Sequence, residues 1–344
     1  MFTLQHVFGA FFIAVLISYG FTPLARQIAF KIKLLDHPDQ RKSHAHPMPL
    51  LGGLALYLAF FAAVLYSVDV NNSYMHGLLI SGTIIFFLGV IDDKLGMMPS
   101  MKLSGQILAA LIIYKAGFRV TTFEDYYISM FLTVFWVVGI TNAFNLLDNL
   151  NGLSSGIAGI ASMFFGLISL YHGDTYTAVI AFALAGASFG FLKHNFPKAS
   201  IFMGDSGSMF LGFMLACLAI LGTWKTDKIT LSLSLPILIL GYPIFDTTLV
   251  TVLRFLEKRP VFIGGRDHSS HILASLGFKK TRAVLVIYAI SFVLGLSALA
   301  VSMSELRVGL AVLVLAAAFM LSLGIFLCTK RLGSAKLKRY NGNE

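Results

Sequence analysis

The sequence is poor in charged residues and in cysteine. Only 12% of its 344 residues are charged, whereas 57% are hydrophobic, so a water-soluble fold would lack the polar side chains to cover its surface. Both cysteines, Cys217 and Cys328, fall within apolar segments, and the sequence therefore predicts neither a disulfide framework nor a zinc site. Low-complexity sequence and convincing internal repeats are also missing. We expect the lipid bilayer to be the solvent of this fold.

Long apolar segments run along the whole chain. Each has roughly 17–24 residues, enough to cross a hydrocarbon core about 30 Å thick as a helix. About eleven are present, at 5–28, 49–68, 74–91, 103–118, 128–146, 154–171, 175–193, 206–223, 229–252, 284–303 and 306–328. The pattern predicts an all-α, polytopic integral membrane bundle. We expect a single transmembrane catalytic domain over 1–328 and a basic cytoplasmic tail over 329–344.

Lysine and arginine are distributed unevenly between the two sets of loops. One set holds 21 of the 26: the loops 25–48, 92–102, 193–205 and 253–283, and the tail after 328. Basic residues are enriched on the cytoplasmic side of membrane proteins, which predicts an outside N-terminus and a cytoplasmic C-terminus. This rule, together with attraction to anionic lipid headgroups, accounts for the net charge of +10. Nucleic-acid binding is not implied.

Carboxylates and amides gather at the predicted cytoplasmic ends of the segments. They are Asp92 and Asp93 at the end of the third, Asn142, Asn145, Asp148, Asn149 and Asn151 at the end of the fifth, Asp205 at the start of the eighth, and Asp246 near the inner end of the ninth. Ionisable groups at membrane depth are costly and often mark function. Segments far apart in sequence thus deliver polar groups to one face, as a bundle does when it builds a site.

Each acidic motif has two interpretations. Adjacent Asp92 and Asp93 repel unless a cation or a shared proton relieves them, but a solvated helix end would look the same. Polar residues at every third position from Asn142 to Asn151 would form a stripe along a helix, or could serve as caps. Asp205, beside Gly204, is a natural N-cap and also a place to hold a phosphate-bound Mg²⁺.

Two basic loops on the same side also contain histidine. The longest cytoplasmic loop carries Gly264-Gly265-Arg266-Asp267-His268-Ser269-Ser270-His271, and arginine and histidine are suited to bind phosphates. A His-x-x-His spacing is also a zinc half-site, but no cysteine ligands lie near it. Lys42 lies in the other loop, and such residues also anchor the headgroup region.

The order of these motifs, from about residue 36 to 290, resembles the polyprenyl-phosphate N-acetylhexosamine-1-phosphate transferase family (glycosyltransferase 4). The resemblance implies Mg²⁺-dependent transfer, with Mn²⁺ able to substitute, of a sugar 1-phosphate from a UDP-N-acetylhexosamine to undecaprenyl phosphate, with release of UMP. N-acetylglucosamine is the expected sugar. It also implies a bacterial cytoplasmic (inner) membrane location, with the site facing the cytoplasm among membrane lipids. The sequence leaves open the hexosamine, the glycan made and whether a homodimer forms.

The resemblance also assigns roles to individual residues. It implies that Asp92, Asp93 and Asp148 are catalytic, that Asp205 and Asn145 bind the metal, that Asn151, Phe202 and Asn142 bind the nucleotide, and that Lys102, Arg266, His268, His271 and Lys42 bind phosphate. Asp92 is the expected general base. Asp93 is expected to position the metal and the lysine.

This chain departs from the family pattern at two places, and two other functions compete with this interpretation. Many bacterial members have aspartate where this chain has Asn151, although eukaryotic relatives have asparagine. The muramyl-pentapeptide branch has three consecutive histidines where this chain separates His268 and His271, which argues against that substrate. A secondary transporter would place its carboxylates near the midplane of an inverted repeat, which is not evident here. A catalytically silent scaffold would not need the acidic motifs.

Overall fold

The computed structural model describes residues 4–38, 46–69, 71–121, 124–222, 229–260, 265 and 267–340, with only the main chain at 229–233 and 334–340. Nearly all of them are helical. The chain forms two compact units, Met1–Lys225 and Thr226–Glu344.

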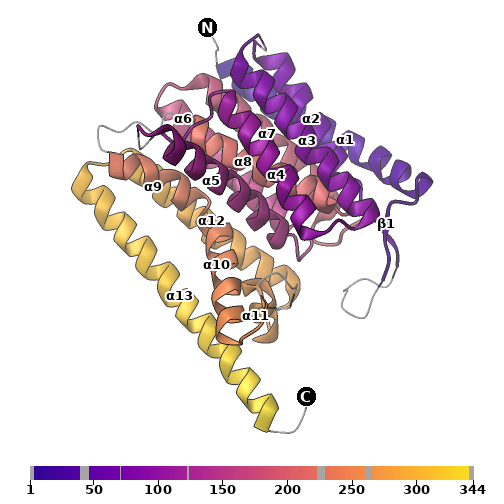
Figure 1. Cartoon of the computed structure of the whole chain (residues 1–344), viewed down its shortest axis with the longest axis vertical. Helices are drawn as coiled ribbons and strands as arrows, with labels where there is room; N and C mark the ends of the chain where they lie inside the picture. Colours follow the sequence, from indigo (N-terminus) through magenta and orange to yellow (C-terminus); the bar gives the residue numbers. More distant parts are fainter. Residues whose placement is uncertain are drawn as a thin grey trace. The chain divides into compact units, whose positions relative to one another are not determined.

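In the part of the first unit that the structure describes, eight helices lie side by side as a bundle (Figure 1). They are α1 (Leu4–Lys31), α2 (Gly52–Ser67), α3 (Ser73–Leu95), α4 (Pro99–Lys115), α5 (Tyr126–Leu147), α6 (Leu153–Tyr171), α7 (Thr175–Asn195) and α8 (Gly204–Leu221). Two short antiparallel strands, β1 (Leu35–Asp36) and β2 (Met48–Pro49), pair between α1 and α2. The predicted segments of this unit match these helices to within a few residues.

Helix α8 is the most enclosed helix of this bundle. It packs against α2, α3, α5, α6 and α7, and 83% of its most apolar 18-residue window is buried, compared with 28% for α1. Glycines let neighbouring backbones approach its first turn, because a side chain at Gly53 or Gly89 would overlap main-chain atoms of Ser206 or Gly207. The fold therefore holds the start of α8 between α2 and α3.

Side-chain caps begin three helices of the first unit. Asn72, Asp125 and Asp174 accept hydrogen bonds from main-chain N–H groups in the first turns of α3, α5 and α7. Such caps satisfy donors that a helix cannot pair internally. Two of the caps are acidic, so capping accounts for Asp125 at the start of α5 and for Asp174 at the start of α7.

The described residues of the second unit form five helices. They are α9 (Ile229–Ile239), α10 (Gly241–Leu256), α11 (Ser269–Ser275), α12 (Lys280–Ser302) and α13 (Leu306–Tyr340). The segment predicted over 229–252 is divided in the structure into α9 and α10, with a break at Leu240. Pro243 has no N–H to bond the carbonyl of Ile239, so one continuous ladder of helix hydrogen bonds cannot form there.

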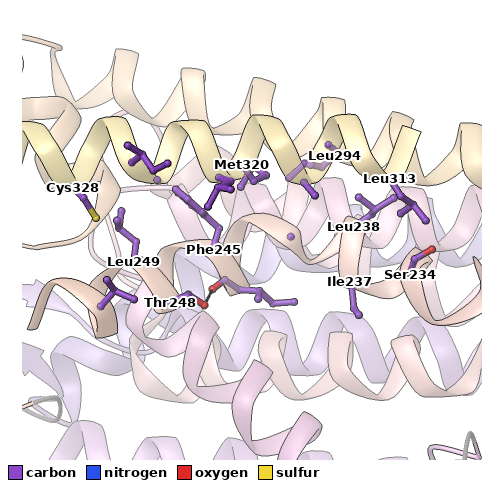
Figure 2. A pocket seen from close by; sticks show the side chains of 18 of the residues that line it. Ser234, Ile237, Leu238, Phe245, Thr248, Leu249, Leu294, Leu313, Met320 and Cys328 are labelled. Carbon is purple, nitrogen blue, oxygen red and sulfur yellow. Dashed lines mark hydrogen bonds between the residues drawn. The ribbon is translucent and has the colours of Figure 1, made fainter. Parts of the chain in front are cut away.

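An apolar cavity of about 770 Å³ lies within the second unit. Helices α9, α10, α12 and α13 line it, with side chains such as Leu238, Phe245, Leu294, Leu313 and Met320 (Figure 2). None of its described lining residues is charged. Because a diphosphate needs charged or hydrogen-bonding partners, this cavity is not the place for a nucleotide sugar.

Eight helices of the described chain are long and apolar enough to span a bilayer: α1, α3, α5, α6, α7, α8, α12 and α13 as far as Gly333. Helix α2, with 16 residues, is apolar but shorter. The prediction of an all-α, polytopic membrane bundle is confirmed. The count of eleven spans and the sides of the two termini stay predictions.

Candidate active site

The polar ends of α3, α4, α5 and α8 meet around the ammonium group of Lys102. Its Nζ lies 2.7 Å from Asp92 Oδ2, donates to Asn145 Oδ1 at 3.0 Å, and forms an ion pair with Asp205 Oδ2. The side chains of Lys102 and Asp92 are only 15% and 12% exposed. At such burial, charges interact more strongly than they do at an open surface. Four helices are thus joined at one cation.

The other hydrogen bonds of the cluster fix the orientation of each ligand group. Asn145 donates through Nδ2 to Asp205 Oδ1 at 2.9 Å and to Ser208 Oγ at 3.0 Å. Its amide oxygen is therefore the atom that faces Lys102. Asp92 Oδ1 accepts the main-chain N–H of Met97 at 2.7 Å. The remaining oxygen of Asp92 is thereby directed to the lysine.

Asp93 has a different role from its neighbour. Its carboxylate accepts the main-chain N–H groups of Asp205 at 2.8 Å and Ser206 at 3.1 Å. The N-cap residue of α8 is Met203, which makes no side-chain capping bond, so Asp93 supplies the cap from α3. Asp205 is not the N-cap that the sequence suggested, and its oxygens face Lys102 and Asn145 instead. Asp92, rather than Asp93, positions the lysine.

Asp148 directly follows the last residue of α5. Its partial burial raises the pKa of its carboxyl to about 8, and the negative charges of Asp205 and Asp93 contribute to the rise. The predicted polar stripe is interrupted here. Because α5 ends at Leu147, Asn142 and Asn145 lie on the helix, whereas Asp148 and Asn151 lie in the turn that follows it.

Asn142 is paired with a residue that sequence reasoning missed. Asn142 Nδ2 donates to Gln106 Oε1 at 2.6 Å, and Gln106 Nε2 returns a bond at 3.3 Å. This pair lies one helical turn from the contact between Lys102 and Asn145. Gln106 follows Lys102 by four positions, and Ser208 follows Asp205 by three, so helical spacing could have identified both. The geometry makes Asn142 a support for the cluster, and its nucleotide role stays a prediction.

Asn151 and Phe202 lie in two loops that are joined through Asn195. Asn195 Oδ1 accepts the N–H of Gly152 at 2.6 Å, and its Nδ2 donates to the carbonyl of Ile201 at 2.8 Å. Gly152 has a φ of +77°, a conformation that glycine adopts without strain. The fold thus places two of the three predicted nucleotide-binding positions, Asn151 and Phe202, at adjoining loops of the first unit.

In the second unit, ion pairs hold Asp267, the residue before His268. Asp267 accepts Arg254 Nε at 2.8 Å and Nη2 at 3.2 Å, and also pairs with Arg259 at 3.0 Å. Burial raises the pKa of Asp267, but the hydrogen bonds and charge of Arg254 outweigh it and hold that pKa below its usual value. His268 and His271 have ring centres 5.9 Å apart. Lys42 and Arg266 lie outside the described residues.

The oxygens around Lys102 fit a divalent cation by their chemistry. Asp92, Asn145 and Asp205 already direct three oxygens at a positive charge, and carboxylate and amide oxygens are the ligands that Mg²⁺ prefers. No group of three or more histidine, cysteine, aspartate or glutamate side chains with a metal-binding arrangement occurs among the residues the structure describes. A metal here would therefore depend on the Asn145 amide together with carboxylates.

Comparison with known proteins gives a consistent assignment. Residues 75–223, which contain the Lys102 cluster, match the family described as glycosyl transferase family 4. A protein of Bacillus subtilis (strain 168), named a probable undecaprenyl-phosphate N-acetylglucosaminyl 1-phosphate transferase, is 36% identical over 320 residues, covering 90% of this chain and 89% of the relative.

Two further relatives come from other bacteria. The decaprenyl-phosphate N-acetylglucosaminephosphotransferase of Mycobacterium leprae (strain TN) is 33% identical over 80% of this chain and 78% of its own length. The undecaprenyl-phosphate alpha-N-acetylglucosaminyl 1-phosphate transferase of Thermotoga maritima is 31% identical over 82% of this chain and 88% of its own. The chain therefore belongs to glycosyl transferase family 4, in the branch of the polyprenyl-phosphate N-acetylglucosamine phosphotransferases.

Proposed function

We propose that this enzyme transfers N-acetylglucosamine 1-phosphate from UDP-N-acetylglucosamine to undecaprenyl phosphate and releases UMP. The observation that carries the proposal is the convergence of Asp92, Asn145 and Asp205 on Lys102 at the ends of four helices. Phosphoryl transfer needs positioned phosphates and neutralised charge more than covalent help from the protein. The names of the bacterial relatives support the choice of N-acetylglucosamine as the sugar and of a polyprenyl phosphate as the lipid acceptor.

The cluster provides the groups that such a reaction requires. An oxygen of the lipid phosphate attacks the sugar-linked phosphorus of the nucleotide, and the bond to the UMP oxygen breaks. Asp92 accepts the remaining proton of the lipid phosphate, while Lys102 offers a cation to the phosphate oxygens. Asp205 and Asn145 would hold Mg²⁺, which when bound neutralises charge on the diphosphate. Phe202 and Asn151 lie on the loops that we assign to the uracil.

We also propose that this cluster faces the cytoplasm in the inner membrane of a bacterium. The bias of lysine and arginine toward the loops on this side supports the orientation. A single cysteine at Met98, in a cysteine-free background, should resist a membrane-impermeant thiol reagent in right-side-out vesicles. One at Glu124 should react. The reverse pattern would place the site outside the cell.

The central experiment is turnover by purified protein in lipid nanodiscs. Undecaprenyl phosphate, Mg²⁺ and a panel of UDP-sugars are supplied, and UMP is measured. We expect release with UDP-N-acetylglucosamine and little with UDP-glucose. Asp205→Asn should lose at least about 10²-fold in rate, whereas Asp174→Asn, the same change at a helix cap on α7, should stay active. Lipid-dependent UMP release from a different UDP-sugar alone would refute the assigned donor.

A further inference from the structure

Asp246 on α10 is the centre of a buried hydrogen-bond network that has no role in the reaction proposed above. The residue is 2% exposed. Its Oδ2 lies 2.8 Å from His268 Nδ1, and its Oδ1 accepts the main-chain N–H of Ser269 at 2.8 Å and the hydroxyl of Ser269. Tyr242 Oη lies 2.5 Å from Ser269 Oγ. One carboxylate thus receives three hydrogen bonds from two consecutive residues.

These contacts determine which ring nitrogen of His268 carries a proton. An ionised carboxylate can only accept hydrogen bonds, so His268 must donate through Nδ1–H. Ser269 then donates its hydroxyl proton to Asp246, and Tyr242 donates to Ser269. With Nδ1 engaged, Nε2 is the atom of His268 that is left to meet a ligand. When the ring carries both protons, its Nε2–H is a charge-assisted donor to phosphate.

The loop does not need Asp246 as its main anchor. Asp267, the residue before His268, accepts two hydrogen bonds from Arg254, and both side chains are almost fully buried. That ion pair fixes the main chain next to His268. Asp246, the second buried carboxylate, instead contacts the imidazole ring of His268. In metal sites, a carboxylate partner fixes the tautomer and the orientation of a histidine in the same way.

We propose that Asp246 is a positioning residue that holds Nδ1 of His268 protonated and presents its Nε2 to a phosphate group. The identity of that group as the diphosphate of the nucleotide sugar rests on the proposed function. Asp246 itself does not touch substrate. Its effect on the reaction should therefore pass entirely through His268.

A double-mutant cycle tests this dependence. Asp246→Asn should raise KM for the UDP-sugar or lower kcat/KM by about tenfold or more, as expected for loss of a supporting carboxylate. In a His268→Ala background the same substitution should change kcat/KM by less than about twofold, because the ring it orients is gone. Equal losses in both backgrounds would overturn the proposal. Ser269→Ala, which leaves the contact between Asp246 and His268, is the matched control and should retain most activity.

Nitrogen-15 NMR of histidine-labelled protein tests the orientation without any turnover. The His268 signal is identified by its disappearance in His268→Gln. We expect a proton on Nδ1 in the wild type and a shift to the Nε2–H tautomer in Asp246→Asn, because an asparagine amide can donate to Nδ1. An Nε2–H tautomer in the wild type would refute the assignment. If the wild type released no UMP, the proposed function would fall, while this spectrum would still decide how His268 is held.

Discussion

The carboxylate of Asp93 on α3 accepts a hydrogen bond of 2.8 Å from the main-chain N–H of Asp205 on α8. Successive residues of a helix point about 100° apart, so Asp92 and Asp93 cannot face the same partner. Asp92 faces Lys102, and Asp93 faces the first turn of α8. The two adjacent carboxylates therefore have different roles. Asp92 contacts the lysine, and Asp93 fixes the helix that carries Asp205.

This division predicts different consequences for stability. Asp93→Ala removes the acceptor for two partly buried main-chain N–H groups and should lower the free energy of unfolding by about 1–3 kcal/mol. Asp92→Ala, the matched neighbour, should cost less, because its partner Lys102 keeps Asn145 and Asp205. Thermal unfolding in detergent measures both. Gly204→Ala should resemble Asp93→Ala, since a Cβ at this residue, whose φ is +70°, would meet the carboxylate of Asp93. An unfolding temperature lowered more by Asp92→Ala than by Asp93→Ala would contradict the capping role.

Much of the fold follows from sequence because helix length and apolarity are local properties. The segments of the first unit were predicted to within a few residues, and the cluster around Lys102 was expected from polar residues at predicted helix ends. The break at Leu240 follows from Pro243, whose missing N–H could have been read from the sequence.

The contacts between helices were harder to predict because they depend on packing. No local sequence pattern shows that Asp93, rather than Asp205, caps α8, because the capping hydrogen bond joins residues that are 112 positions apart. The same holds for the pairing of Gln106 with Asn142, and for Asp246 with His268. In each case the sequence marks a polar side chain at membrane depth, but only the packed helices show which atom it meets.

Lys102 should compete with a divalent cation for the same oxygens. In the structure its ammonium occupies the position at which Asp92, Asn145 and Asp205 converge. Lys102→Met removes the positive charge at similar side-chain length, so substrate-free protein should bind Mn²⁺ several-fold more tightly, as measured by electron paramagnetic resonance of free Mn²⁺. Lys115→Met, at the other end of α4, is the control and should leave the affinity unchanged. Weaker binding by Lys102→Met would show that the lysine helps to build the metal site.

Asp148 predicts a pH dependence of stability in metal-free protein. Its pKa in the fold is about 8, well above the ordinary value of about 3.9 in an unfolded chain. The folded state therefore binds this proton more tightly than the unfolded chain does. The contribution of Asp148 to the free energy of unfolding is fully present below about pH 4 and is lost as pH rises toward 8. Asp148→Asn cannot ionise, so its unfolding temperature should rise relative to wild type across this window and level off above it. A difference that stays constant with pH would exclude the raised pKa.

The role of Asp92 can be separated from that of Asp93 through the protonation state of the acceptor. A phosphate monoester has its second pKa near 6, so the lipid phosphate carries a proton at about pH 5.5 and has largely lost it at about pH 8.5. If Asp92 accepts that proton, Asp92→Asn should be most impaired near pH 5.5 and should recover in part as pH rises. Recovery should be incomplete, because the contact with Lys102 is altered at every pH.

Asp93→Asn is the matched control, since it makes the same change one residue away. It should show no such recovery, because Asp93 fixes α8 and takes no proton from substrate. Initial rates of UMP release across the pH range, divided by those of wild type, give the comparison. Parallel profiles for the two variants would remove the distinction between them. A covalent aspartyl-phosphate route makes a different prediction: wild type would release one equivalent of UMP before lipid is added, and such a burst would exclude direct attack by the lipid phosphate.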